Sequence, residues 1–420
     1  MTDVRRPPVP PLRRTHALAQ RISSVRTRVA LRSLPGLAYN PDHPTEEGEA
    51  AVPEPPAIAF EASIFDVLRT ALRITRADPR FAFHAVRLLR RQRQAARRRG
   101  AHTARGISVP PFLIYSITGR CNLDCIGCYA NILHASDRAE LDDARVERLF
   151  GEFETLGSSV VLIAGGEPFL RPGLLERTAA HPRILFLVFT NGSLLDADAI
   201  ETLRRQRHVI TVLSIEGSAE QTDRRRGEGT HAHVLSVMDR LRERRVFFGT
   251  STTLTSENFD RATSDAHVRE LVERGCRLFY YINYVPVQPG TDHLQLEPEQ
   301  VQELEARLTR FRTTLPALFI AFPHDEVALG GCLAAGRGFV HINAYGDVEP
   351  CPFSPYSDTN LNDVPFERAL ASPLFRRILD SDVVLDETDG RCALWKRREW
   401  VAGLLAAGEN LRDDGAGPGE

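Results

Sequence analysis

Three cysteines with the spacing C-x3-C-x2-C, Cys121, Cys125 and Cys128, lie within the run from Ser116 to Ala130. Three thiolates can hold three irons of a 4Fe–4S cluster and leave the fourth iron open to a substrate or cofactor. A structural zinc site is the alternative, but zinc sites use four ligands, commonly in two paired motifs, and no second paired motif adjoins this loop. The spacing therefore predicts an iron–sulfur site where chemistry takes place on the cluster.

Three further motifs follow predicted strands: Gly165-Gly-Glu-Pro168, Thr190-Asn191 and Ser214-Ile-Glu-Gly217. Glycines let backbone carbonyls approach a ligand closely. Carbonyls and a carboxylate can then accept hydrogen bonds from an ammonium group. Because the carboxyl ends of parallel strands share one edge of a sheet, all these loops are expected on the same face as the cysteines.

The cysteine loop and these motifs together resemble the radical S-adenosylmethionine (SAM) superfamily, over about residues 110–290. The resemblance implies that the open iron binds the amino and carboxylate groups of SAM. Reductive cleavage then gives a 5′-deoxyadenosyl radical, which abstracts a hydrogen atom from the substrate. The residues that it implies for SAM binding are Gly165, Gly166, Glu167, Pro168, Thr190, Asn191, Ser214, Glu216, Arg226 and Tyr129.

Within that set, Ser214 is the expected partner of the SAM carboxylate. Arg226 is a charged partner taken from a run of three arginines, because arginine can bind a carboxylate through two nitrogens. Glu216 stands where the family more often has Asp. Many members carry an aromatic residue before the third cysteine; here that residue is Gly127, so the adenine contact is expected from Tyr129 or from backbone.

A second set of cysteines, Cys332, Cys351 and Cys392, lies nearer the C-terminus. The spacing from Cys332 through Gly346 to Cys351 is similar to the opening of SPASM and twitch domains, which implies an auxiliary 4Fe–4S cluster. A hairpin over 339–351 would bring Cys332 and Cys351 together. The fourth ligand is left open: either a residue such as His341 or Asp347 fills it, or the iron is free. The alternative is three buried structural cysteines.

Strands and helices alternate along residues 110–290, as in βα units with a parallel sheet. We expect an α/β fold: a partial (β/α)6 TIM-like barrel with an N-terminal helical extension and a small C-terminal twitch-like domain. The expected strands are 112–117, 159–164, 184–189, 209–215, 246–254 and 277–285, and the expected helices are 144–156, 174–180, 197–204, 233–244 and 266–274.

The chain is expected to divide into five parts. Residues 1–62 are rich in Pro and Arg and are expected to be disordered. Residues 63–109 form a basic helical extension with a new helical start at Pro79. The core barrel covers 110–315, the twitch-like domain 316–400 and a tail 401–420. The extension either packs on the barrel or binds a membrane surface or an acidic partner.

These observations predict a cytoplasmic radical SAM enzyme, because no apolar run spans a bilayer and no export signal precedes the cysteines. The substrate is expected to be a small molecule or lipid, with a peptide, as in maturase-type enzymes, as the alternative. Flavodoxin or ferredoxin is the expected electron donor, and no nucleic acid is expected. The competing class is a metal-binding scaffold protein, in which the Gly-Gly-Glu-Pro motif has no purpose.

Overall fold

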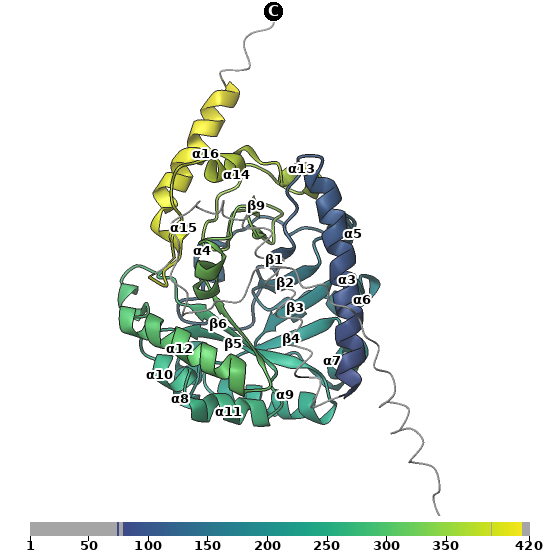
Figure 1. Ribbon diagram of the computed structural model, residues 1–420, viewed down its shortest axis with the longest axis vertical. Helices are drawn as coiled ribbons and strands as arrows, with labels where there is room; N and C mark the ends of the chain where they lie inside the picture. Colours follow the sequence, from purple (N-terminus) through teal and green to yellow (C-terminus); the bar gives the residue numbers. More distant parts are fainter. Residues whose placement is uncertain (1–73, 75–78, 388, 414–420) are drawn as a thin grey trace, which may run out of the picture. The chain divides into compact units, whose positions relative to one another are not determined.

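A nine-stranded sheet lies at the centre of the computed structural model, which describes residues 74, 79–387 and 389–413. Its strand order is β7-β6-β5-β4-β3-β2-β1-β8-β9 (Figure 1). Every neighbouring pair from β7 to β8 is parallel, and only β8 and β9 are antiparallel. The strands are β1 (Phe112–Thr118), β2 (Val160–Gly165), β3 (Leu185–Thr190), β4 (Val209–Ser214), β5 (Phe248–Leu254), β6 (Leu278–Asn283), β7 (Leu318–Phe322), β8 (Phe339–Ile342) and β9 (Val348–Glu349).

Helices connect the strands and cover the outer face of the sheet (Figure 1). The N-terminal and barrel helices are α3 (Pro79–Thr103), α4 (Tyr129–Leu133), α5 (Asp143–Leu156), α6 (Leu174–Ala180), α7 (Ala197–Arg205), α8 (Ala219–Arg226), α9 (Thr230–Glu243), α10 (Phe259–Ala262), α11 (Asp265–Glu273) and α12 (Pro298–Thr314). Later helices are α13 (Phe366–Ala369), α14 (Pro373–Leu379), α15 (Ala393–Lys396) and α16 (Arg398–Asp413), and single 3-10 turns are η1 (Pro168–Leu170), η2 (Asp292–Leu294) and η3 (His324–Leu329).

Local sequence explains where these elements begin and end. Every residue of β1 is buried, as expected for a parallel strand covered on both faces. Helix α5 begins where the Asp142 side chain accepts a hydrogen bond from the Arg145 N–H at 2.6 Å, and it ends at Gly157 with φ of 99°. The predicted alternation of strands and helices, and the partial barrel that it implies, are confirmed.

The parallel sheet is longer than the sequence predicted. Strand β7 adds to β6 beyond residue 315, where the barrel was expected to end. Strand β8, which belongs to the predicted C-terminal hairpin, pairs in parallel with β1. The sheet curls so far that the ring centroids of Phe322 and Phe339, from β7 and β8, lie 5.4 Å apart. The C-terminal hairpin is therefore part of the barrel sheet.

The basic helix α3 packs along the barrel beside α5 (Figure 1). Its Gln92 and Arg99 side chains are buried, with 2% and 4% of their surface exposed. Arg99 donates to the carbonyl of Gly157 and to the Ser159 hydroxyl, and Gln92 donates to the Ser159 carbonyl at 3.3 Å. Arg99, one of the basic residues of α3, therefore anchors this helix to the barrel.

Some predictions fall outside the described residues: the disorder of 1–62 and the helix over 63–78, except Ile74, together with the last part of the tail, 414–420. The described part of that tail is helical, because α16 runs to Asp413. Among the described residues, no helix combines the length and apolar character needed to cross a membrane.

Candidate active site

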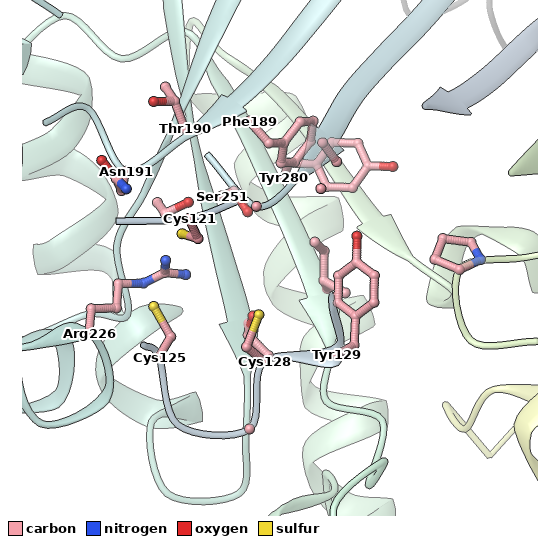
Figure 2. Close-up of a pocket in the computed structure, with 18 of the residues that line it drawn as sticks. Cys121, Cys125, Cys128, Tyr129, Phe189, Thr190, Asn191, Arg226, Ser251 and Tyr280 are labelled. Carbon is pink, nitrogen blue, oxygen red and sulfur yellow. The ribbon is translucent and has the colours of Figure 1, made fainter. Parts of the chain in front are cut away.

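The loop after β1 carries the three cysteines of the first motif. Neighbouring elements fix the later part of this loop: Cys128 precedes the first residue of α4, and the Ile126 N–H donates to the Arg225 carbonyl at 2.9 Å. Figure 2 shows the side chains of Cys121, Cys125 and Cys128 around one open space. All three line the same open cavity at the carboxyl ends of the strands.

The Gly-Gly-Glu-Pro segment closes against the start of the cysteine loop. The Gly166 N–H donates to the Thr118 carbonyl and the Glu167 N–H donates to the Arg120 carbonyl, each at 2.8 Å. A Cβ atom on Gly165 would lie 2.3 Å from the Thr118 oxygen, and one on Gly166 would lie 2.0 Å from the Arg120 oxygen. The two glycines are therefore required first of all by the contact between these two loops.

The Glu167 carboxylate joins the loops after β2 and β3. It accepts hydrogen bonds from the Thr190 hydroxyl and the Asn191 N–H, both at 2.8 Å, and from the Phe169 N–H at 3.1 Å. Burial raises the pKa of Glu167. Gly165, Gly166, Glu167, Thr190 and Asn191 all line the cavity, whereas Pro168 is buried at the start of η1.

Two arginines at the end of α8 face the cysteines. Arg225 and Arg226 both line the cavity, and Figure 2 shows the Arg226 guanidinium beside Cys125. Burial raises the pKa of Cys125, and the positive charges of Arg226 and Arg225 oppose this rise. The sequence singled out Arg226 alone; Arg225 lies in the same run of arginines, and only the direction of its side chain identifies it.

Glu216 orients these arginines from behind. Its side chain, 1% exposed, is paired with both Arg225 and Arg226, and its Oε2 accepts from the Thr253 N–H at 3.1 Å. Burial raises its pKa, but the two arginines outweigh burial and hold the pKa below its usual value. Ser214, the first residue of this motif, lines the cavity, whereas Glu216 is not among the lining residues.

Apart from Ser251, Thr253 and Asn283, the remainder of the cavity is apolar and aromatic. Phe189 and Tyr280 make an edge-to-face contact, with ring centroids 5.1 Å apart (Figure 2). Tyr129 packs against Phe353, with ring centroids 5.2 Å apart. This apolar half is lined by Ile114, Leu162, Phe189, Tyr280, Ile282, Val285, Phe322 and Phe353. The charged residues that line the cavity are Glu167, Arg225 and Arg226, so charge is confined to the side of the cysteines.

Tyr284 occupies the space beside Gly127. A Cβ atom on Gly127 would lie 3.1 Å from the Tyr284 hydroxyl oxygen and 3.2 Å from its ring. The hydroxyl group donates to the Thr291 hydroxyl at 2.9 Å, which fixes the ring. Sequence reasoning placed Tyr129 as the aromatic residue of this region; Tyr129 lines the cavity, and Tyr284 lines it as well.

Comparison with known proteins agrees with this arrangement. The family profile described as the Radical SAM superfamily matches residues 115–280. The chain is 24% identical to the AdoMet-dependent heme synthase of Methanosarcina barkeri over 328 residues, which cover 71% of this chain and 92% of that protein. The chain contains a radical SAM domain. Its match to the superfamily and to enzymes within it identifies it as an enzyme.

Two further comparisons describe its relatives. The chain is 27% identical to the mycofactocin maturase MftC of Mycobacterium ulcerans over 293 residues, 65% of this chain and 78% of that protein. Its fold is similar to that of Streptococcus suis SuiB bound to the precursor peptide SuiA, with a TM-score of 0.55, 17% identity and 72% of each chain covered. The fold of this radical SAM enzyme is thus that of solved members of the superfamily.

The donor set around the first three cysteines fits the 4Fe–4S cluster and SAM that the superfamily implies. Three thiols face one space, two guanidinium groups balance the charge of a thiolate cluster, and Glu216 keeps both guanidinium groups in place. A cluster bound by three thiolates needs this charge balance because it carries negative charge in a partly buried site.

The later cysteines of this radical SAM enzyme also meet in space. Cys332, Cys351 and Cys392, called here the second cysteine cluster, are 2%, 3% and 9% exposed. The three thiols lie close enough to one another for their charges to interact. The hairpin of β8 and β9 and the helix start at α15 bring them together.

The two residues considered as a fourth ligand from the sequence have other partners. The His341 ring nitrogens contact the Ser116 hydroxyl at 2.8 Å and the Glu349 carboxylate at 2.6 Å. Burial lowers the pKa of His341 to about 3. Asp347 accepts from Arg138 at 2.7 Å and supports the hairpin turn through Asn343. Both side chains are thus already engaged by other groups.

Proposed function

We propose that this enzyme cleaves SAM at a 4Fe–4S cluster held by Cys121, Cys125 and Cys128, and that the resulting radical takes a hydrogen atom from a largely apolar substrate. When bound, the cluster supplies the electron for this cleavage. The observation that carries the proposal is the convergence of the three thiols, the Gly-Gly-Glu-Pro loop and the α8 arginines on one cavity.

The polar half of the cavity suits SAM. Arg225 and Arg226 offer donors for its carboxylate, beside Ser214. Glu167 Oε2 accepts one hydrogen bond from within the chain, from Asn191, and a carboxylate oxygen has room for a second donor, which suits the SAM ammonium. Thr190 and Asn191 form the neighbouring wall, where the ribose would lie, and Tyr129 and Tyr284 offer apolar faces for the adenine.

The apolar half of the cavity supports a substrate with an uncharged, flat or aliphatic body. The residues of this half offer van der Waals contacts and few hydrogen-bonding groups, as in pockets for apolar ligands. A small molecule of this kind agrees with the similarity to a heme synthase. A peptide is the second candidate, favoured by the similarity to a maturase and to an enzyme whose structure contains a precursor peptide.

We also infer an auxiliary iron–sulfur cluster at the second cysteine cluster. Its three thiols are buried and lie close together. Cysteines that only fill space in the core would have no reason to converge on one place. An auxiliary cluster can exchange an electron with the substrate or anchor it. Because thiol-bound clusters are kept in reducing compartments, we place the enzyme in the cytoplasm, with flavodoxin or ferredoxin as electron donor.

Production of 5′-deoxyadenosine tests the main proposal. Anaerobically reconstituted enzyme with SAM and dithionite should form it, and a Cys121→Ala, Cys125→Ala, Cys128→Ala variant should not. Iron content should be about eight per chain in the wild type and about four in this variant, as expected for two 4Fe–4S clusters. Absence of 5′-deoxyadenosine from fully loaded wild-type enzyme would refute the proposed reaction.

The substrate class is tested by which compounds increase that yield. Heme-precursor porphyrins should stimulate 5′-deoxyadenosine formation, and stimulation by peptides alone would favour the second candidate. Phe353→Arg, which places a charge in the apolar half, should remove the stimulation and retain the basal, uncoupled formation. As a control, Val327→Arg changes an exposed valine outside this cavity and should leave both unchanged.

A further inference from the structure

Two buried carboxyl groups lie beside the second cysteine cluster. Glu326 and Glu387 are 2% and 1% exposed. One ligand atom from each, together with the Cys332 sulfur, lies within 4.8 Å of the other two. A buried carboxylate is costly unless a cation, a metal ion or good hydrogen bonds compensate it, so this pair calls for an explanation.

The chain packs tightly to bring Glu387 to Cys332. The Cys332 N–H donates to the Leu385 carbonyl at 3.1 Å. Gly331 has a φ of 93°, and a Cβ atom there would lie 2.5 Å from the same carbonyl oxygen. Only glycine allows the two segments to approach this closely, so the position of Glu387, two residues after Leu385, is built into the fold.

The two carboxyl groups differ in how their oxygens are used. Glu326 Oε1 accepts from the Leu333 N–H at 3.1 Å, and Glu387 Oε1 accepts from the Ala393 N–H at 3.2 Å. Glu387 Oε2, in contrast, is fully buried without a well-formed hydrogen bond. The Cys332 thiol and the Glu326 carboxyl group lie beside this side chain. Leaving such an oxygen unsatisfied is unfavourable, and more so if it is charged.

We propose that Glu387 is the fourth protein ligand of the auxiliary cluster, with Oε2 bound to the iron that Cys332, Cys351 and Cys392 leave open. This inference rests on the auxiliary cluster proposed above. The hydrogen bond from the Ala393 N–H to Oε1 orients the Glu387 carboxylate. Because Ala393 directly follows Cys392, the segment that carries the Cys392 ligand also positions the Glu387 ligand. The Glu326 carboxyl group lies within 4.8 Å of the same Glu387 and Cys332 atoms, and its Oε1 already accepts from the Leu333 N–H. A cluster with four protein ligands is suited to electron transfer rather than to binding substrate at an open iron.

The test uses the full chain with Cys121, Cys125 and Cys128 changed to Ala, so that any cluster belongs to the second cysteine cluster. The protein is reconstituted anaerobically with iron and sulfide, and its iron content, electron paramagnetic resonance spectrum and Mössbauer spectrum are measured. The parent should hold about four irons, one of them with a distinct Mössbauer signal from an oxygen ligand.

Glu387→Ala should lower this content to about three irons and give the signal of an oxidised three-iron cluster, because the iron without a protein ligand is lost. Glu387→Cys should keep about four irons, without the distinct iron and with altered spectra. Glu387→Gln keeps a side-chain oxygen that can accept the hydrogen bond from the Ala393 N–H but removes the negative charge that binds iron. It therefore tests loss of the carboxylate ligand without loss of this local hydrogen bond. Glu326→Gln is the matched control and should keep the parent's iron content and its distinct iron.

Unchanged iron content and spectra in Glu387→Ala and Glu387→Gln would overturn the ligand assignment while leaving the auxiliary cluster intact. Loss of the distinct iron in Glu326→Gln alone would move the assignment to Glu326. A parent that binds zinc without sulfide, or no metal at all, would overturn the auxiliary cluster and the ligand assignment together. These outcomes are separable because production of 5′-deoxyadenosine by the wild type is measured independently.

Discussion

Replacing Gly166 by alanine should disturb the cysteine loop through a single added methyl group. The new Cβ atom would lie 2.0 Å from the Arg120 carbonyl oxygen and 3.0 Å from the Cys121 nitrogen. Since real Cβ contacts are essentially never below 3.0 Å, the loop must move by about 1 Å. Gly166 does not have a positive φ, so the effect is a steric one and not a dihedral one.

The magnitude follows from the two contributions to this clash. Overpacking of a well-packed site costs about 1–3 kcal/mol. Movement of the loop also weakens the hydrogen bond from Glu167 to Arg120, 2.8 Å long, which is worth about 1 kcal/mol. We therefore expect Gly166→Ala to lower the free energy of unfolding by about 3 kcal/mol. Because Cys121 directly follows Arg120, the first cluster should also be lost, so that total iron falls from about eight per chain towards about four.

Urea unfolding of the anaerobic apoprotein and iron analysis after reconstitution measure the two effects. Gly151→Ala is the matched control, because Gly151 lies inside α5 and a Cβ atom there would meet no other atom within 4 Å. It should stabilise the helix by about 0.5–1 kcal/mol. A Gly166→Ala protein as stable and as rich in iron as the wild type would refute the close contact between the two loops.

Two other predictions concern buried charge. Glu216→Gln removes the counter-charge of two arginines, so it should lower the free energy of unfolding by about 3–5 kcal/mol and weaken SAM binding measured by calorimetry. Glu257→Gln breaks an exposed ion pair and should lower the free energy of unfolding by less than about 1 kcal/mol. Equal losses in the two variants would contradict this difference between a buried and an exposed pair. His267 is 3% exposed, and burial lowers its pKa to about 4. Because the folded pKa is depressed, its stabilising effect is present above about pH 6.5 and is lost as the pH falls through about 4. Between pH 7 and 5 the wild type should thus lose about 2 kcal/mol more than His267→Gln in urea unfolding, and parallel pH profiles would argue against it.

The sequence alone determined six strands of the barrel, five of its helices and the loops that carry the first motifs. Apolar runs, capping residues and glycines act over a few residues, so strands such as β1 and helices such as α6 could be predicted nearly to their ends. The spacing of Cys121, Cys125 and Cys128 belongs to one loop, and the motifs follow successive parallel strands, so their meeting at one edge follows from topology.

Only the tertiary structure decided contacts between segments far apart in the chain. The hairpin of β8 and β9 is a local feature and was predicted, but the pairing of β8 with β1 joins residues more than 200 positions apart. The choice of Arg225 and Arg226 over Arg224 depends on where Glu216 lies. Glu387 carries no sequence signal as a ligand, since its approach to Cys332 depends on how Gly331 packs on Leu385. Such contacts are set by side-chain direction and long-range packing, which local patterns of residues do not encode.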